Sequence, residues 1–364
     1  MKSIKEVLEE ISSPISPLER INMALRLEKP DRVPIAPVIT IHTPPDLRKA
    51  EEYFEKIFID LGGCDGFFFW PLTLMTGRSY TPGKPGAPEA VTIMKDSTGY
   101  DELMEEGFMS YLSRVYREQD LDEDIEKALT YAAEQTRAFA QKWEGERKVP
   151  LYAGALGIVP FGFLAYARGF TEIVKDIIRY PWKINRTCDT IVDEMTKLFI
   201  KLCEISNVRR LWLSFINSTP ETVGPPNFSS FVWPTARIMI EQLIDAKIVP
   251  ILQFDVDASP VFNYLKELPK GECILHLDSS TDIIKAKESV GNYMCVMGNV
   301  SFLKLATEED VKVYCKDLIN RVGEKGGFIL SSDNPIVMDE EPIEKVKAII
   351  DVKKNIRDMI KRRS

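Results

Sequence analysis

Two carboxylates close an apolar run in the stretch "ILQFDVDASP". The run Ile248–Phe254 has the composition of a strand that is covered on both faces, and Asp255 and Asp257 follow where that strand ends. Carboxylates at such a position either lie in a solvated turn, where they can cap the next helix, or belong to a catalytic or metal site. The segments "ECILHL" and "GGFILSS" have the same strand-like character and are followed by Asp278 and Asp333.

Three residues at these strand ends have side chains that bind divalent metals. His276 lies 21 positions after Asp255 (276 − 255), about one strand–helix unit, and Asp333 lies 78 positions after Asp255 (333 − 255). Two carboxylates and one imidazole leave a coordination position open, as a catalytic zinc site requires. We therefore predict that Asp255, His276 and Asp333 are catalytic and bind zinc or another divalent metal. The alternative is a hydrogen-bonded packing role for His276 and solvated carboxylates.

Three further acidic residues are candidates to complete the ligand set. Asp257 shares its strand end with Asp255. Asp278 lies two residues beyond His276, so it would point to the same side of the strand and could orient the imidazole. Glu241 lies in a predicted helix and would reach the site only if that helix starts near the same end of the barrel.

The elements that must position these residues alternate between strand and helix through the second half of the chain. Such alternation predicts a parallel sheet with right-handed crossovers, and about eight units favour a (β/α)8 TIM barrel, an α/β fold. We expect a single domain over residues 1–364, with residues 1–30 as an N-terminal helical extension. An open doubly wound sheet is the alternative, but no GxGxxG follows the first strand.

Local patterns give expectations for individual segments. They predict strands over 33–40 and 66–70, helices over 171–206 and 258–267, and a long polar loop over 216–234. The run "FFFW" in the second strand is expected to pack in the core. The polar loop carries Asn227, Phe228 and Phe231, which can supply an aromatic wall and hydrogen-bond partners for a ligand. For His42 we expect a structural role or a hydrogen bond to substrate.

The composition excludes several classes of function. A net charge of −8 at pH 7 opposes nucleic acid as a partner. No run approaches the length of a membrane-spanning helix, so we expect no membrane partner. The start of the chain lacks the apolar core of a signal peptide, and the six scattered cysteines mostly have apolar neighbours. These features predict reduced, buried thiols in a cytoplasmic protein, and the absence of CxxC argues against a thiolate zinc site.

Four segments of the chain resemble the uroporphyrinogen decarboxylase superfamily, which includes corrinoid-dependent methyltransferases. The segments are "RINMALRLEKPDRVPIAPV", "GALGIVPFGFLAYARG", "FSSFVWP" and "GNVSFLKLATEEDVKVYCKDLINRVGEKGGFILSSDNPIVMDEEPIEKVKAI". The resemblance covers most of the chain and implies a (β/α)8 barrel. In the decarboxylase branch an arginine-rich motif after the first strand binds a substrate with many carboxylates. Here that place reads "PVITIHTPPDLR", with only Arg48 nearby, so the chain is more similar to the methyltransferase branch.

The chain also departs from the methyltransferases that act on a thiol. Those proteins bind zinc through a His-x-Cys motif and a later cysteine. Here the first motif reads Gln253-Phe254-Asp255, and the later position falls on Asp333 or Asn334. Oxygen ligands make a metal harder and more Lewis-acidic than thiolates do, which suits it to polarise an ether oxygen. We infer that His276 would supply the missing imidazole.

The resemblance with these departures implies the methyltransferase component of an O-demethylase. Such an enzyme cleaves a methyl ether of a methoxylated aromatic compound and transfers the methyl group to the cob(I)alamin of a separate corrinoid protein. A metal would neutralise the charge that develops on the leaving phenolate. Members often form homodimers, which we also expect here. The residues expected to hold the aromatic ring and its substituents are Trp70, Tyr152, Asn217, Asn227, Phe228 and Phe231.

Three alternatives stay open at this point. The methyl donor could be an alcohol or an amine, or the acceptor a thiol. The chain could instead be a metal-free decarboxylase in which Asp255 or Asp257 acts as acid or base. It could also be an inactive barrel that only binds a corrinoid protein or a tetrapyrrole. A metal requirement separates the methyltransferase from the decarboxylase, and methyl transfer to free cob(I)alamin separates it from the inactive barrel.

Overall fold

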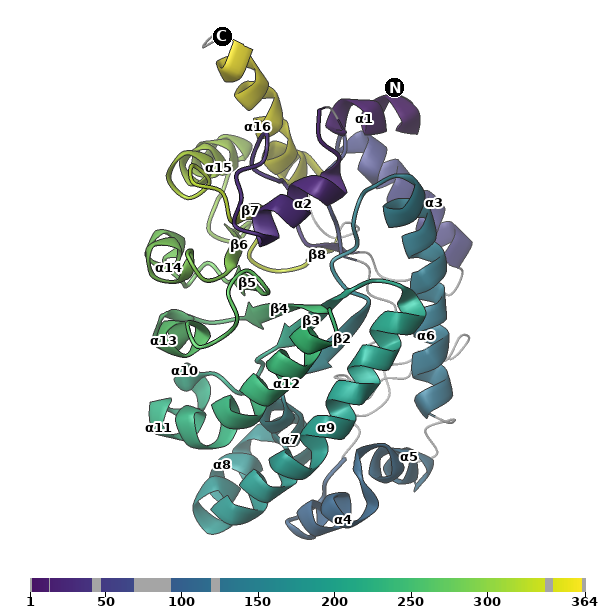
Figure 1. The fold of residues 1–364 in the computed structure, drawn as a ribbon, viewed down its shortest axis with the longest axis vertical. Coiled ribbons are helices and arrows are strands. Elements are labelled where there is room, and N and C mark those ends of the chain that lie inside the picture. The colour runs from purple at the N-terminus through teal and green to yellow at the C-terminus, as the bar shows by residue number, and fades with distance from the viewer. Residues whose placement is uncertain are drawn as a thin grey trace. The chain divides into compact units, whose positions relative to one another are not determined.

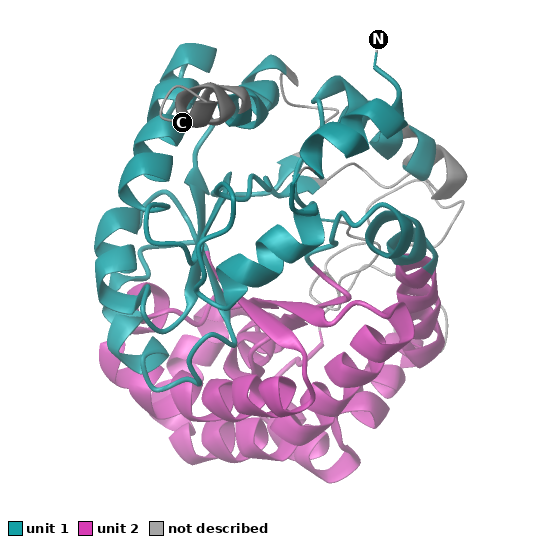
Figure 2. Cartoon of the chain, turned by 45° about the horizontal axis from the view of Figure 1, so that its top comes forward, with its two compact units in different colours: residues 1–70, 138–152, 255–364 teal, residues 71–137, 153–254 magenta. Residues whose placement is uncertain are grey.

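The structure is a computed structural model that describes residues 2–12, 14–40, 47–68, 93–118, 125–337 and 343–361. The contacts between residues divide the chain into two compact units, which are coloured separately in Figure 2. Unit 1 comprises Met1–Trp70, Ala138–Tyr152 and Asp255–Ser364, and unit 2 comprises Pro71–Arg137 and Ala153–Phe254.

Unit 1 begins with two short capped helices, α1 (Ile4–Ile11) and α2 (Pro17–Leu25). The Ser3 side chain caps α1 in a reciprocal pair with Glu6, and the Ser16 side chain accepts a hydrogen bond from the first turn of α2. Each cap satisfies backbone N–H groups that a helix leaves without an intrahelical partner. These helices confirm the predicted N-terminal helical extension.

The second half of unit 1 alternates between strand and helix, as the sequence predicts. Strands β5, β6 and β7 pair in parallel, so that His276 lies opposite Met297, and Asn299 lies opposite Ser331. The elements are β1 (Ile39–Thr40), α3 (Leu47–Asp60), a π-helical turn (Gln141–Glu146), a 3-10 turn (Ser259–Val261), α13 (Phe262–Leu265), β5 (Ile274–Leu277), α14 (Ile283–Val290), β6 (Cys295–Val300), α15 (Glu308–Arg321), β7 (Phe328–Ser332), β8 (Ile336–Val337) and α16 (Ile343–Lys361).

The first strand is much shorter than predicted. Regular pairing covers only β1, which pairs with β8, whereas Ile35 makes a single parallel bridge to Leu330 of β7. The reason is that Pro34 and Pro37 have no N–H to donate to a neighbouring strand. In the described part of the predicted second strand, residues 66–68, one bridge forms, between Phe67 and Leu151.

An aromatic cluster forms much of the core of unit 1. Phe54, Phe58, Phe67 and Phe139 surround Trp143, with ring centroids as close as 4.8 Å for the Phe67–Trp143 pair. Mixed tilted and edge-to-face geometries are typical of favourable aromatic packing. Phe67 and Phe68 are fully buried, so the expectation that this aromatic run packs in the core is confirmed for both.

Unit 2 contains three parallel strands in the order β2–β3–β4, with α9 and α12 packed on them (Figure 1). The register places Gly157 opposite Leu213, and Leu213 opposite Leu252. The elements are α4 (Thr98–Glu106), α5 (Phe108–Glu118), β2 (Ala155–Ile158), α7 (Pro160–Arg168), α8 (Phe170–Arg179), α9 (Pro181–Ser206), β3 (Arg210–Ser214), α10 (Pro220–Val223), α11 (Pro225–Asn227), a π-helical turn (Phe228–Val232), α12 (Trp233–Asp245) and β4 (Val249–Phe254). Helix α6 (Ile125–Ala140) runs from unit 2 into unit 1.

The strand positions agree with the predicted fold. In chain order they are the segment 33–40, the segment 65–68, the segment 150–158 that contains β2, and then β3, β4, β5, β6 and β7. The pairings between them in the described residues are parallel, and helices separate them along the chain. This pattern confirms an α/β fold of the (β/α)8 class.

Two segments differ from the sequence prediction. The predicted loop over 216–234 is largely helical, because Pro220 and Pro225 each start a short helix and Thr219 forms a capping box with Thr222. The predicted helical stretch 171–206 is divided at Tyr180 into α8 and α9, since Pro181 begins a new helix and cannot continue the previous one. The six cysteines are all buried and free of disulfides, as expected.

A buried ion network joins the beginning of unit 1 to its first two strand segments. Arg20 is fully buried, and its guanidinium donates to Asp31 at 2.7 Å and to Asp65 at 2.6 Å. Asp65 also accepts hydrogen bonds from Arg32 and from the Ile35 backbone N–H at 2.8 Å. Burial alone would raise the pKa of Asp65, but the charges of Arg32 and Arg20 outweigh it and lower that pKa. The carboxylate is therefore held ionised.

We predict that Arg20→Ala lowers the free energy of unfolding by about 3–5 kcal/mol, because the substitution leaves buried carboxylates without one of their cations. Denaturant titration at neutral pH measures the change. The matched control is Arg26→Ala near the end of the same helix region, where the ion pairs with Glu19 and Glu28 are exposed and about 0–1 kcal/mol is expected. Equal effects of the two substitutions would contradict the structural role of the network.

Candidate functional site

Polar side chains gather at the carboxyl ends of β5, β6 and β7 in unit 1. We call the group formed by His276, Asp278, Asn299 and Asp333 the strand-end cluster. His276 lies within β5 and Asn299 within β6, while Asp278 and Asp333 directly follow β5 and β7. Carboxyl ends of parallel strands are where barrel enzymes place their reacting groups, so this cluster is the candidate active site of unit 1.

His276 is fully buried and neutral. Its Nε2 lies 3.0 Å from the Ser332 carbonyl oxygen on β7. Burial lowers the pKa of His276 to about 4, although the bond to Ser332 and the charge of Asp278 both oppose that shift. Because a carbonyl oxygen can only accept, the single proton of the neutral ring is assigned to Nε2, and Nδ1 carries the lone pair. Any ligand role of this imidazole would therefore fall to Nδ1.

Asn299 links the ends of β5 and β6 to helix α15. Its amide nitrogen donates to the carbonyl oxygens of Asp278 at 3.2 Å and Thr281 at 3.0 Å, and its amide oxygen accepts from the Tyr314 hydroxyl at 2.8 Å. The preceding Gly298 has φ +131°, and an added Cβ would lie 2.7 Å from a β5 carbonyl oxygen. Only glycine therefore allows β6 to approach the β5 carbonyl this closely at the position before Asn299.

The two carboxyl groups of the cluster have different environments. Asp278 accepts hydrogen bonds from the Ser280 hydroxyl at 2.6 Å and from the Asn334 amide at 3.2 Å. Burial raises the pKa of Asp333, and the negative charge of Asp278 adds to this shift, while hydrogen bonds with Ser279 and Ser301 oppose it. A carboxyl group that keeps its proton to higher pH can act as a general acid, so the pair can divide the roles of proton donor and hydrogen-bond acceptor.

The predicted metal ligands do not form a ready ligand set. Within the described ranges, no three His, Cys, Asp or Glu side chains come close enough together to hold a metal ion. Asp255 is exposed, and the Asp257 carboxylate accepts from the Ser259 hydroxyl at 2.7 Å, as a capping residue does. Glu241 lies in the third turn of α12 and pairs with Arg237 on the same helix at 2.8 Å. Zinc binding by Asp255, His276 and Asp333 stays a prediction.

The predicted substrate-binding residues of unit 2 are mostly used within the fold. Phe228 is fully buried and its ring stacks on Trp233, and Phe231 is also buried. The Asn227 amide donates to the Val223 carbonyl at 2.7 Å. Asn217 follows β3 with φ +56°, a left-handed conformation that asparagine tolerates well, and it is half-buried.

Of the three remaining predicted substrate contacts, the structure describes Tyr152. Tyr152 is fully buried in unit 1, and its hydroxyl donates to the Ala36 carbonyl at 3.0 Å. His42 and Trp70 lie outside the described residues.

Sequence reasoning did not identify four side chains that support the cluster. Ser279 and Ser301 contact Asp333, Thr281 accepts from the Ala258 N–H at 2.9 Å, and Tyr314 binds Asn299 from the middle of α15. The serines directly follow strands in "LDSST" and "NVSF", so a search for hydroxyls after strand ends would have found them. Tyr314 has no local signal because its partner lies 15 residues earlier on another element.

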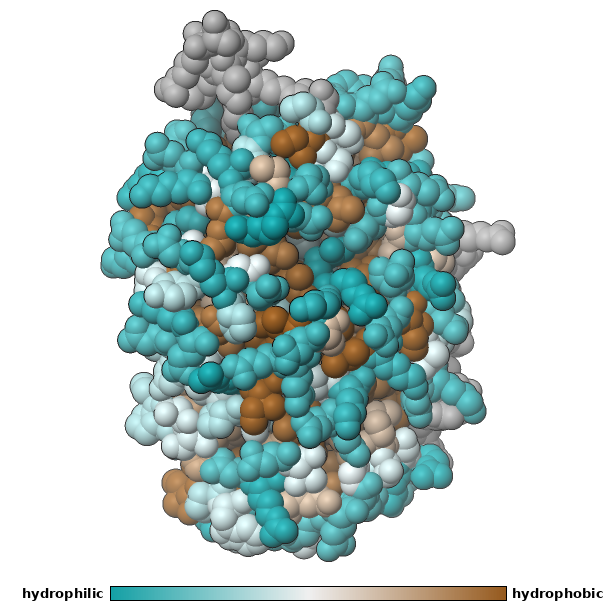
Figure 3. Space-filling model, in the orientation of Figure 1, coloured by the Kyte–Doolittle hydropathy of each residue, from teal (hydrophilic) through white to brown (hydrophobic). Residues whose placement is uncertain are grey.

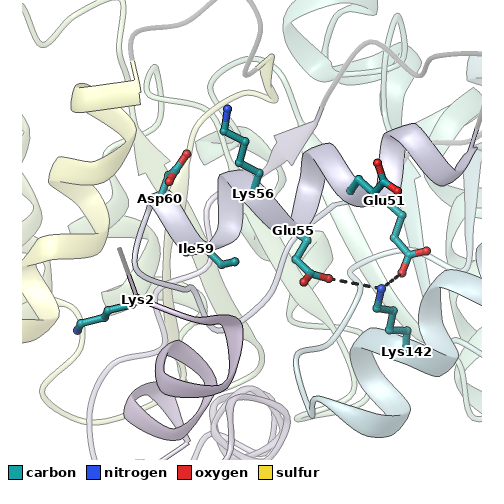
Figure 4. Close-up of a pocket in the computed structure, with 8 residues that line it drawn as sticks. Lys2, Glu51, Glu55, Lys56, Ile59, Asp60 and Lys142 are labelled. Atoms are coloured by element: carbon teal, nitrogen blue, oxygen red, sulfur yellow. Dashed lines mark ion pairs between the residues drawn. The ribbon is translucent and has the colours of Figure 1, made fainter.

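A separate cavity of about 690 Å³ lies beside α3 in unit 1 (Figure 4). Its wall is almost entirely charged, and Lys142 forms ion pairs there with Glu51 and, at 3.4 Å, with Glu55. Ile59 is the apolar member of the described lining. An aromatic ligand needs apolar walls, so this cavity is a poor fit for the predicted substrate.

Comparisons with known proteins place the fold in a known group. Residues 103–356 match the family model described as uroporphyrinogen decarboxylase (URO-D). A uroporphyrinogen decarboxylase from Trichodesmium erythraeum (strain IMS101) is 21% identical over 224 residues, which are 59% of this chain and 61% of that protein. The chain thus matches about three fifths of that relative's length. No helix in the described part of the chain is long and apolar enough to cross a membrane.

A solved structure covers more of the chain. A methyltransferase from Methanosarcina mazei superposes with a TM-score of 0.66 and covers 94% of this chain and 99% of that one. The sequence identity is 15%, so this likeness shows a shared fold.

We predict that the His276 imidazole stays neutral down to about pH 4. The chain has two histidines, so the spectrum contains few ring signals. The signals that disappear in His276→Gln belong to His276, and those that remain belong to His42. An NMR pH titration of the labelled rings measures the midpoint. Because the folded-state pKa is lower than the ordinary 6.5, the folded state loses stability as pH falls from 6.5 to 4, by about 3 kcal/mol in total. A His276 midpoint near 6.5 would contradict the buried, neutral ring.

Proposed function

Because the chain belongs to the uroporphyrinogen decarboxylase family, we propose that it is a methyltransferase acting on a methoxylated aromatic compound. It would transfer the methyl group to the cob(I)alamin of a separate corrinoid protein. The observation that carries this proposal is the strand-end cluster, in which the buried Asp333, a carboxyl group with a raised pKa, directly follows Ser332, whose carbonyl is bonded to the neutral imidazole of His276. The fold shared with a methyltransferase over 94% of the chain supports it.

The charge of the cluster favours this reaction over decarboxylation of a polycarboxylate. Such a substrate would meet the Asp278 carboxylate, and the exposed Lys304 donates to the Ser279 carbonyl oxygen at 2.8 Å. Like charges in a partly buried site repel, so an acidic substrate would be disfavoured. A neutral aryl ether avoids that cost.

The proposed chemistry needs a proton at the leaving oxygen. The cob(I)alamin of the partner supplies the nucleophile for the methyl carbon when it is bound. As the ether C–O bond breaks, its electron pair stays on the aryl oxygen, and Asp333 donates a proton there to form the phenol. Asn299 positions the Asp278 end of β5, and the His276 bond to Ser332 ties the end of β7 to β5, with β6 between them in the sheet.

We predict that the purified protein demethylates a neutral methoxylated aromatic compound such as 2-methoxyphenol in the presence of free cob(I)alamin, with loss of the Co(I) absorbance and release of one free phenolic hydroxyl per methyl group. Methanol and methylamines in the same assay test the other donors. Release of carbon dioxide from uroporphyrinogen without any methyl transfer would contradict the proposal and favour the decarboxylase.

We predict that Asp333→Asn lowers kcat about 10²–10⁴-fold with a smaller change in KM for the ether, because an amide cannot donate the catalytic proton. Asp255→Ala and His276→Ala should also abolish demethylation while leaving the fold largely intact. The matched control is Glu308→Gln on α15, an exposed carboxylate that pairs with Lys312. Circular dichroism checks the fold, and full activity of Asp333→Asn would remove its assigned role.

The divalent metal is a separate proposal. The described side chains form no metal ligand set, and the proton donation proposed for Asp333 does not depend on a metal. We propose that elemental analysis after zinc loading gives about one zinc per chain, lost in Asp255→Ala and in His276→Ala. That result would require these side chains to move together on binding. No zinc in the wild-type protein would remove the metal from the site and leave proton donation by Asp333 unaffected.

A further inference from the structure

Unit 1 contains a cavity of about 570 Å³ beside the amino ends of β5, β6 and β7, which we call the amino-end cavity. Its lining comes from the segments that lead into these strands. Lys270 precedes β5, Asn292 precedes β6, and Lys325 and Gly326 precede β7. The strand-end cluster lies at the opposite, carboxyl ends of the same strands, and the six residues of β6 span about 20 Å. The amino-end cavity is therefore a second, separate site on unit 1.

Positive charge predominates in the lining of the amino-end cavity. The charged members are four cations and two carboxylates: Lys270, Lys287, Arg321, Lys325, Glu288 and Glu324. The chain as a whole has a net charge of −8 at pH 7, so the sign of the charge is reversed here. Figure 3 shows mainly hydrophilic residues on the side where Figure 1 places α14 and α15. A hollow with an excess of positive charge concentrates anions, so the cavity favours an anionic ligand.

The exposed cations of the cavity are not held by strong internal pairs. Within the described residues, Lys270 and Lys325 form no ion pair. Arg321 pairs with Asp317 at 3.2 Å, but the two side chains are 55% and 47% exposed. Exposed pairs of this kind contribute about 0–1 kcal/mol, so the guanidinium can also bind a ligand at little cost.

Lys287 on α14 is the least exposed cation of the cavity. Its Nζ donates to the Gly326 and Gly327 carbonyl oxygens at 2.7 and 2.8 Å. An ammonium group has three N–H donors, so one remains for a ligand. Burial lowers the pKa of Lys287, because the interior disfavours its charge. An anion in the cavity would offset that cost by stabilising the charged form.

The arrangement of the cations suits a phosphate group better than a carboxylate. They come from different elements, since Lys287 lies on α14, Arg321 ends α15 and Lys325 precedes β7. A phosphate group presents three strong acceptor oxygens to donors from several directions, whereas a carboxylate has two oxygens in one plane. The cavity volume lies in the range of small-molecule sites, about 300–1,000 Å³, so it has room for more than the phosphate.

We propose that the amino-end cavity binds a phosphorylated small molecule. Arg321, Lys325 and Lys287 would hold the phosphate group, and Asn292 would bond to the polar remainder of the ligand. This site is separate from the strand-end cluster, so the inference does not depend on the proposed function.

Isothermal titration calorimetry of the full chain, in a phosphate-free buffer of low ionic strength, tests the proposal. The probes are glucose 6-phosphate, adenosine monophosphate and inorganic phosphate, with glucose, sulfate and citrate as controls. We expect at least one of the two organic phosphates to bind about tenfold or more tightly than inorganic phosphate, sulfate or citrate, and glucose not to bind.

Three substitutions place that binding in the cavity. Arg321→Gln and Lys325→Gln should each weaken it about fivefold or more, because each removes a cation. Glu324→Gln should strengthen it about twofold or more, because it removes a charge that repels the phosphate. The matched control is Lys316→Gln, which removes an exposed lysine of α15 outside the cavity and should change binding less than about twofold. Lys287 is left unchanged, since its bonds to Gly326 and Gly327 hold the segment before β7.

Several outcomes would overturn the proposal. One is the absence of binding by every phosphate compound up to about 10 mM, and another is binding of sulfate or citrate as tightly as the organic phosphates. Unchanged affinity in both Arg321→Gln and Lys325→Gln would place the ligand elsewhere. An equal loss in Lys316→Gln would show a general effect of charge. Because calorimetry measures binding and not turnover, a protein without methyltransferase activity still gives a clear result.

Discussion

The bond between Arg20 and Asp65 is the interaction on which the start of unit 1 depends. Pro34 and Pro37 have no N–H to donate, so the first strand pairs with β7 through few backbone bonds, among them Ala36 N–H to the Leu330 carbonyl at 2.8 Å. Asp65 compensates, because one oxygen accepts the Ile35 N–H while the carboxylate also binds Arg20 and Arg32. A buried ion pair adds little net stability compared with apolar packing, but it specifies which groups meet. Here it fixes helix α2 and two strand segments to one point.

Burial also determines the protonation of the side chains at the carboxyl ends of β5 and β7. The interior disfavours charge, so His276 is neutral and Asp333 holds its proton to higher pH than an ordinary carboxyl group. Asp278 is only partly buried and is bonded to Ser280 and Asn334. The two aspartates, at the ends of β5 and β7, thus have different surroundings. Asn299 donates to the Asp278 backbone carbonyl at the end of β5 and accepts a hydrogen bond from Tyr314 on α15.

The sequence predicted those features that depend on local pattern. Strand–helix alternation was enough to predict the fold class, and strand-end residues such as His276 and Asp333 could be found from the apolar runs before them. It failed where contacts between distant residues decide the outcome. Phe228 looked like part of a ligand-binding loop, but helical turns place its ring against Trp233 in the core. The Tyr314–Asn299 bond and the burial of His276 depend on how β5, β6 and β7 pair, which no single segment reveals.

The burial of every cysteine makes thiol chemistry a local measure of unfolding. Burial raises the pKa of Cys64 and Cys203 to about 12, so almost no thiolate is present at neutral pH in the folded state. An alkylating reagent therefore reacts only when the chain around a thiol opens. Cys188 and Cys203 lie in unit 2, whereas Cys64 and Cys273 lie in unit 1. The order in which these thiols are alkylated therefore reports which unit opens first.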